Sequence, residues 1–207
     1  IKDGSFHKNI ILPKDWYDVY MNTVMLVSYY RTYTHFFQRN LLHLAQISPY
    51  LDDKLRIYST HNYLQSNKEE FAGSIRFALV RDPIECITSS ITLDATAGKL
   101  TPKRVAYVID EWVDFHTKLL KEDNLNLIWC NDLKTKPLKT FLKIAEIIGI
   151  DIIRDTIIEQ KDISDFNYLS TKTTLQGYGQ AFKAVSSSDL SKAYKIYAKL
   201  VKQSLVV

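Results

Sequence analysis

Hydrophobic and polar positions alternate in blocks along the chain. Short apolar runs predict buried strands at residues 24–28, 55–59, 75–80 and 125–130. Helical spacing of apolar positions predicts helices up to about Leu44, at 82–91, from Thr101-Pro102 onward, and at 137–148, 152–160 and 190–203. Strands that alternate with helices are typical of a parallel sheet covered on both faces. We therefore predict an α/β fold with three layers, α/β/α, and a central, mostly parallel sheet.

Two of the predicted helices show a clear apolar stripe. The long helix has its apolar positions at Val105, Ile109, Trp112, His116 and Leu119, so His116 is expected to lie in or beside the core rather than in a catalytic site. In the helix that starts at Pro137, the stripe is expected to hold Leu138, Phe141, Leu142, Ala145 and Ile148. Gly149 follows directly and is expected to end this helix.

Length and charge narrow the class of protein. The 207 residues fit a single domain, 1–207, and the 27 Lys and Arg against 23 Asp and Glu give a net charge of +4. This mild excess suits an anionic ligand and is too weak to indicate nucleic acid. There is no membrane-spanning run and no signal-peptide core, and Cys86 and Cys130 lack metal-ligand spacing. We expect a cytoplasmic protein with reduced cysteines, no metal and no membrane span.

The segment from Ala78 to Ser89 carries the most specific chemistry. A short strand ends at Arg81, and a helix follows in which Asp82 can cap the first turn and Glu85 can complete a capping box. Ligands of open α/β sheets bind at the carboxyl ends of the strands. A guanidinium and a hydroxyl that converge there, from Arg81 and Ser89, suit a phosphate group.

This spacing resembles the 3′-phosphate-binding motif of sulfotransferases that use 3′-phosphoadenosine 5′-phosphosulfate (PAPS), and further segments match in order over roughly residues 24–200. Ser28–Phe37 is similar to the family's 5′-phosphosulfate loop. The resemblance implies a P-loop-like sulfotransferase fold, with PAPS as sulfonate donor and 3′-phosphoadenosine 5′-phosphate (PAP) as product. It implies that the cofactor is bound by Arg31, Thr32, Tyr33, Thr34, His35, Phe36, Arg81, Ser89 and Lys172.

Within the loop, Arg31 takes the family's basic place, Thr32 and Thr34 its hydroxyl places, and Phe36 the aromatic place near the adenine. Tyr30 replaces a proline, Tyr33 a glycine and His35 a hydroxyl residue. Glycine tolerates positive φ and close approach to a ligand, whereas tyrosine does so only at a cost. Either the loop has an ordinary right-handed conformation, or this half of the site is impaired.

Three more segments extend the resemblance. Ile57–His61 is similar to the strand end that carries the family's general base, which makes His61 the candidate base, although Ser59 replaces a lysine. Residues 127–149 resemble a scaffold segment. Residues 179–183 resemble the stretch where a mobile loop covers the nucleotide before the last helix. The basic motif usual there is missing, and Lys172 is the nearest basic substitute.

The resemblance implies transfer of a sulfonate from PAPS to a hydroxyl or amine of a small-molecule or saccharide acceptor. His61 would take the acceptor's proton, and Arg31 would stabilise the leaving phosphate. Two alternatives remain: a PAP- or PAPS-binding protein of the same fold with altered catalysis, and a nucleotide kinase. The absence of a glycine-rich lysine loop counts against the kinase. The sequence leaves the acceptor and the oligomeric state open.

Overall fold

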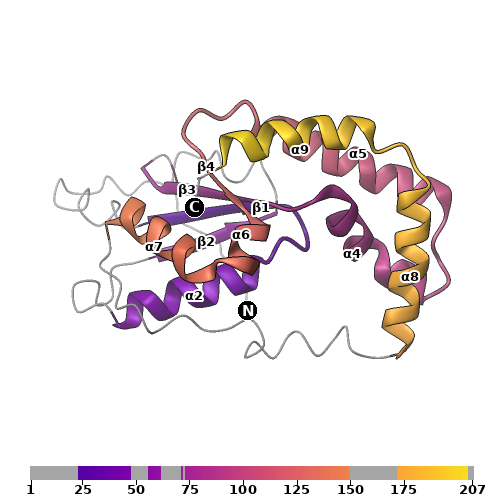
Figure 1. Ribbon diagram of the computed structural model, residues 1–207, viewed down its shortest axis with the longest axis horizontal. Coiled ribbons are helices and arrows are strands. Elements are labelled where there is room, and N and C mark those ends of the chain that lie inside the picture. Colours follow the sequence, from indigo (N-terminus) through magenta and orange to yellow (C-terminus); the bar gives the residue numbers. More distant parts are fainter. Residues whose placement is uncertain (1–22, 48–55, 62–70, 72, 150–171, 205–207) are drawn as a thin grey trace, which may run out of the picture.

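The computed structural model describes residues 23–47, 56–61, 71, 73–149 and 172–204. In this part of the chain four strands form one sheet: β1 (Thr23–Ser28), β2 (Arg56–Thr60), β3 (Ile75–Val80) and β4 (Asn126–Trp129). Their order is β2-β1-β3-β4, and every neighbouring pair is parallel (Figure 1). The predicted parallel sheet is confirmed.

The central strands are buried on both faces because they carry unbroken apolar runs. All six residues of β1 are buried. Met25 and Val27 contribute to one core cluster, whereas Val24 and Leu26 contribute to a second cluster on the other face. Successive side chains of a strand point to opposite faces, so one apolar run can supply both clusters.

Helices cover both faces, which confirms the three-layer α/β/α architecture. The first core cluster includes side chains of α4 (Pro83–Thr96), α5 (Pro102–Leu119), α8 (Lys172–Ser186) and α9 (Ser191–Gln203). The second includes side chains of α2 (Thr34–Ile47), α6 (Cys130–Thr135) and α7 (Pro137–Ile148). In Figure 1, α5 and α9 lie above the sheet and α2 and α7 below it, while α4 and α8 lie beyond its right-hand end.

The long helix α5 buries the predicted stripe, and His116 is a fully buried core residue. In α7 the stripe differs from the prediction. Leu138 is 40% exposed and Leu142 is half-buried, whereas Thr140 and Ile144 are buried. Thr140 can occupy a core position because its hydroxyl donates to Lys136 O, a local bond that hydrophobicity does not indicate. Gly149 ends the helix as predicted, with φ of 77°.

The loop predicted at residues 179–183 is wrong, because these residues lie within α8. This helix lies against α4, and Gly177 makes the close approach possible. A Cβ atom at Gly177 would clash with the Thr96 hydroxyl and would lie 3.0 Å from Thr96 N and 3.1 Å from Thr92 O. The sequence also did not predict α6, and the helix predicted at 152–160 lies outside the described residues.

The described residues contain neither a membrane-spanning helix nor a cluster of metal ligands. No helix among them is long and apolar enough to cross a membrane. They also contain no group of three or more His, Cys, Asp and Glu side chains that could hold a metal ion.

Candidate functional site

Two loops meet at the carboxyl ends of β1 and β3. The helices that follow these two strands lie on opposite faces of the sheet. The chain leaves β1 through residues 29–33 into α2 on one face, and it leaves β3 through Arg81 and Asp82 into α4 on the other face. Since β1 and β3 are neighbours, their carboxyl ends form a topological switch point. A crevice at such a point is the usual ligand site of an open α/β sheet.

The loop that follows β1 has an unusual backbone. Arg31 has φ of 64° and Tyr33 has φ of 60°, although neither is glycine. The right-handed alternative is therefore wrong. Left-handed conformations cost about 1–2 kcal/mol for residues with a Cβ atom, and they persist where the surrounding structure holds them.

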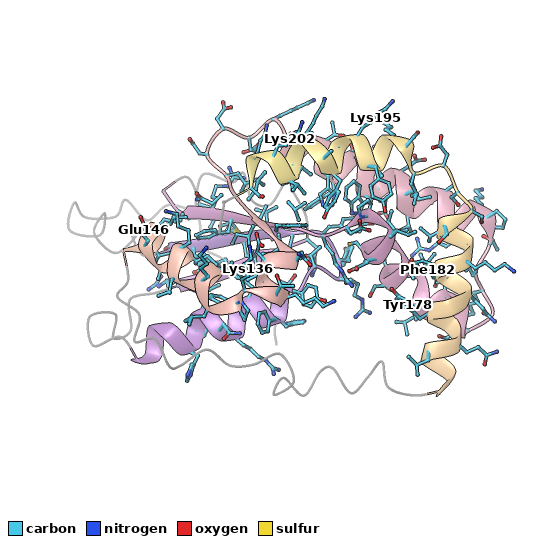
Figure 2. All side chains as sticks on the ribbon, in the orientation of Figure 1. Lys136, Glu146, Tyr178, Phe182, Lys195 and Lys202 are labelled. Atoms are coloured by element: carbon cyan, nitrogen blue, oxygen red, sulfur yellow. The ribbon has the colours of Figure 1, made fainter. Side chains whose placement is uncertain are left out.

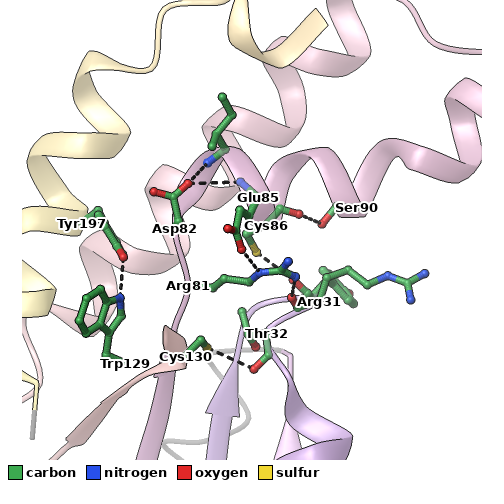
Figure 3. Close-up of polar contacts among 12 residues, drawn as sticks. Arg31, Thr32, Arg81, Asp82, Glu85, Cys86, Ser90, Trp129, Cys130 and Tyr197 are labelled. Carbon is green, nitrogen blue, oxygen red and sulfur yellow. Dashed lines mark hydrogen bonds and ion pairs between the residues drawn. The ribbon is translucent and has the colours of Figure 1, made fainter. Parts of the chain in front are cut away.

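Side chains hold the carbonyl oxygens of this loop one after another. Ser28 O accepts a hydrogen bond from His61 Nδ1 at 2.8 Å, and Tyr29 O accepts one from Thr32 Oγ1 at 2.7 Å. The next three carbonyls are bound by side chains that follow β3 and β4 (Figure 3). These contacts are Cys86 Sγ to Tyr30 O at 3.1 Å, Arg81 Nη1 to Arg31 O at 2.7 Å, and Cys130 Sγ to Thr32 O at 3.5 Å.

Because the carbonyls are occupied, the backbone groups of this loop that a ligand could use are its N–H groups. The loop runs directly into α2, whose first N–H groups have no partner within the helix. Residues of alternating handedness aim successive N–H groups at one point and form an anion-binding concavity. The first turn of α2 contains no acidic residue that would compete with an anion.

Three of the side chains predicted to bind the cofactor instead form hydrogen bonds or packing contacts inside the protein. Thr32 is fully buried and bonds to Tyr29 O, while Thr34 is buried and shares a 2.8 Å hydrogen bond with Ser28 Oγ. Phe36 is buried in the core, with its ring 6.1 Å from that of Phe141. The structure does not bring these side chains to the mouth of the crevice, so their contribution there is limited to backbone groups.

The remaining predicted residues of this region are more accessible. Arg31 and His35 are exposed, and Tyr33 is half-buried. Ser89 is half-buried on α4, one helical turn beyond Glu85. Lys172 is the first residue of α8, and its side chain lies outside the described part.

Arg81 is fixed by three contacts. Its Nη1 donates to the loop, its Nε donates to Glu85 at 3.2 Å, and its guanidinium lies 5.0 Å from the centre of the Tyr33 ring. Asp82 caps α4 as predicted, whereas Glu85, expected in a capping box, accepts from Arg81 instead. Arg81 therefore links the loop to α4, and one of its donors is already paired with a carboxylate.

His61 is exposed and held through one ring nitrogen. A carbonyl oxygen can only accept, so the 2.8 Å contact to Ser28 O assigns the proton of the neutral ring to Nδ1. The lone pair then lies on Nε2, where an incoming acceptor could use it. The ring also packs against the Tyr30 ring at a tilt of 37°, with 4.6 Å between centroids. This geometry suits a general base.

A cavity of about 260 Å³ adjoins Arg81 and Tyr33. Sequence reasoning missed the other residues that give it its character, which are Trp129, Asn131, Lys134 and Tyr197. Trp129 Nε1 donates to the Tyr197 hydroxyl at 2.6 Å and so ties α9 to the end of β4. Trp129 ends β4, and Asn131 and Lys134 follow it directly in α6. This position at the carboxyl end of a parallel strand is the signal that could have identified these three residues.

Tyr178 of α8 is a further residue that sequence reasoning missed (Figure 2). Burial raises the pKa of its phenol, while the positive charge of Arg81 opposes that rise. The positive charge of Arg81 therefore acts on this hydroxyl. By contrast, Lys195 and Lys202 project from the outer face of α9.

Comparisons of the sequence with known proteins assign the chain to no family. No protein-family model matches the chain, and no curated protein matches it. Among solved structures, it is similar to mouse sulfotransferase SULT7A1 complexed with PAP, with a TM-score of 0.45 and 15% sequence identity. The match covers 86% of this chain and 88% of that chain. A likeness at this TM-score carries no weight of its own, so the fold rests on the sheet topology and the site on its contacts.

Proposed function

We propose that the protein binds PAPS with its 5′-phosphosulfate in the loop of residues 29–34 and transfers the sulfonate to an acceptor hydroxyl or amine. The observation that carries the proposal is the loop itself. It lies at a switch point and at a helix N-terminus, with its carbonyls occupied and the candidate base His61 attached to Ser28. Such a loop suits a ligand with several anionic oxygens.

Arg31 supplies the positive charge in this arrangement. Its side chain is exposed in the loop, and a guanidinium stays protonated at all relevant pH values. It therefore acts as an electrostatic clamp on the leaving phosphate and not as an acid. Fixed charges and dipoles aimed at a developing negative charge are a large source of catalysis.

His61 takes the acceptor's proton on Nε2. As the acceptor oxygen or nitrogen forms its bond to sulfur, the bond from sulfur to the 5′-phosphate oxygen breaks and PAP leaves. The bond from Nδ1 to Ser28 O orients the ring and stabilises the imidazolium formed when Nε2 is protonated. The acceptor class stays as predicted from sequence, a small molecule or a saccharide.

The 3′-phosphate end has two groups of candidate contacts. Arg81 and Ser89 come from the motif, and Lys134 adds a cation from the adjoining cavity. Glu85 already pairs with Arg81, so an incoming phosphate must compete with this carboxylate for the guanidinium. Lys172 stays a prediction.

The test is a calorimetric titration with PAP, with AMP and ADP as controls. We expect micromolar binding that requires the 3′-phosphate and that weakens when Ser89 or Lys134 is replaced by alanine. Charge-assisted contacts of this kind contribute about 1.5–3 kcal/mol each. Equal binding of PAP and ADP would overturn the assignment of PAPS.

Transfer activity separates the enzyme from a catalytically altered binder. Two observations favour the altered-binder alternative. Ser59 is exposed near His61, where the resemblance expects a lysine, and Tyr33 is left-handed where the resemblance expects a glycine. PAP binding without transfer from PAPS to any acceptor in a panel of phenols, amines and saccharides would support that alternative.

A further inference from the structure

We propose that Cys86 and Cys130 are positioning residues whose thiols hold the 29–34 loop in its anion-binding shape. The inference rests on the anion site of the proposed function, and it does not depend on the identity of the nucleotide. It explains how a loop without glycine keeps two left-handed residues in place.

The two thiols approach the loop from opposite sides. Cys86, near the start of α4, belongs to the core cluster on one face of the sheet, and Cys130, the first residue of α6, belongs to the cluster on the other face. Their sulfur atoms lie 3.1 Å from Tyr30 O and 3.5 Å from Thr32 O (Figure 3). They therefore bracket Arg31, one of the two residues with positive φ.

Arg81 completes the arrangement. It binds Arg31 O, the carbonyl between the two that the thiols contact. Three consecutive carbonyls are thus held by side chains that follow the neighbouring strands β3 and β4. With these oxygens directed into the protein, the adjacent N–H groups can face the crevice.

The thiols are donors because they stay protonated. Both side chains are buried, and burial raises the pKa of Cys86 to about 12 and raises that of Cys130 as well. A buried cysteine is often only a small apolar residue of the core. Here both sulfur atoms meet carbonyls of one loop from two separate clusters, which filling the core does not require.

The experiment measures the affinity of the intact protein for inorganic pyrophosphate and for PAP by calorimetry. Cys86→Ala and Cys130→Ala remove the donors, whereas Cys86→Ser and Cys130→Ser keep them. A net hydrogen bond is typically about 1 kcal/mol, so each alanine variant should bind both ligands about 3- to 10-fold more weakly. The serine variants should stay within about 2-fold of the wild type.

Thr92→Val is the matched control. Thr92 is buried in the same helix as Cys86, and its hydroxyl bonds to Thr88 O at 2.8 Å, away from the loop. This variant should lower the melting temperature and leave pyrophosphate affinity unchanged.

Each outcome has a distinct meaning. Alanine variants that bind like the wild type, or serine variants that bind as weakly as the alanine variants, would overturn the positioning role alone. Wild-type protein that binds pyrophosphate but shows no preference for PAP would overturn the PAPS assignment and leave the positioning role standing. Wild-type protein that binds neither ligand would overturn both.

Discussion

At the scale of single residues, the site depends on backbone contacts that residue types do not indicate. The sequence could suggest His61 and Arg31 by position, and the structure adds that Ser28 O fixes the His61 ring. The sequence could not show that Tyr33 is left-handed, because residue type disfavours that conformation. It also assigned the Thr32 hydroxyl to a ligand, whereas that hydroxyl closes the loop on itself.

Replacing His61 tests its role as the base. His61→Asn keeps a side-chain N–H that can donate to Ser28 O and removes the basic nitrogen. We expect PAP affinity to stay close to that of the wild type and transfer to fall by about 10²-fold or more, the usual contribution of a general base. Single-turnover assays with PAPS would measure the rate. His43→Gln, which alters a histidine with no assigned role, should leave it unchanged.

Arg31 allows stability and function to be separated. Arg31→Gly and Arg31→Ala both remove the charge, so both should weaken pyrophosphate binding. Only glycine relieves the strain at φ of 64°. The free energy of unfolding of the Arg31→Gly variant should therefore exceed that of the Arg31→Ala variant by about 1 kcal/mol. Urea unfolding measures this difference. Equal stability of the two variants would show that the left-handed residue is not strained.

At the scale of elements, the apolar pattern predicted most strands and helices. The sequence did not predict where two helices pack closely together. The strands and the end of α7 at Gly149 followed from apolar runs and glycine. The helix α8 was missed because Gly177 and Gly179 look like loop residues, whereas Gly177 serves helix packing. The short helix α6 was missed because Cys130 continues the apolar run of β4.

The two glycines of α8 make a matched pair. A side chain at Gly177 meets Thr96 and the backbone of α4, whereas nothing lies within 4 Å of the corresponding position at Gly179. Gly177→Ala should therefore destabilise the protein by about 1–3 kcal/mol, the usual cost of overpacking. Gly179→Ala should stabilise it by about 0.5–1 kcal/mol through helix propensity. Chemical denaturation would reveal the opposite signs, and destabilisation by both variants would argue against this helix contact.

At the scale of the whole molecule, the core on the α5 face continues up to the loop of residues 29–34. His116 is fully buried and stacks on Trp112 with 3.8 Å between ring centroids. Its ring also lies 5.7 Å from that of Tyr29, the first residue after β1. Its Nδ1 donates to Trp112 O, while its Nε2 has no hydrogen-bond partner among the described residues. A proton added to Nε2 would place an uncompensated charge in this layer.

Acid should therefore destabilise the protein through His116. Burial lowers the pKa of this residue from 6.5 to about 3, so between these values the unfolded chain binds a proton that the folded chain does not. The stabilisation is fully present above about pH 6.5 and declines below it by up to about 1.4 kcal/mol for each pH unit, until the folded pKa is reached.

Urea unfolding of the wild type from pH 7 to pH 4.5 should show this decline. His116→Phe removes the titrating ring and should lose this part of the pH dependence, because the decline belongs to one buried imidazole. An unchanged pH dependence in that variant would place the acid sensitivity elsewhere in the molecule.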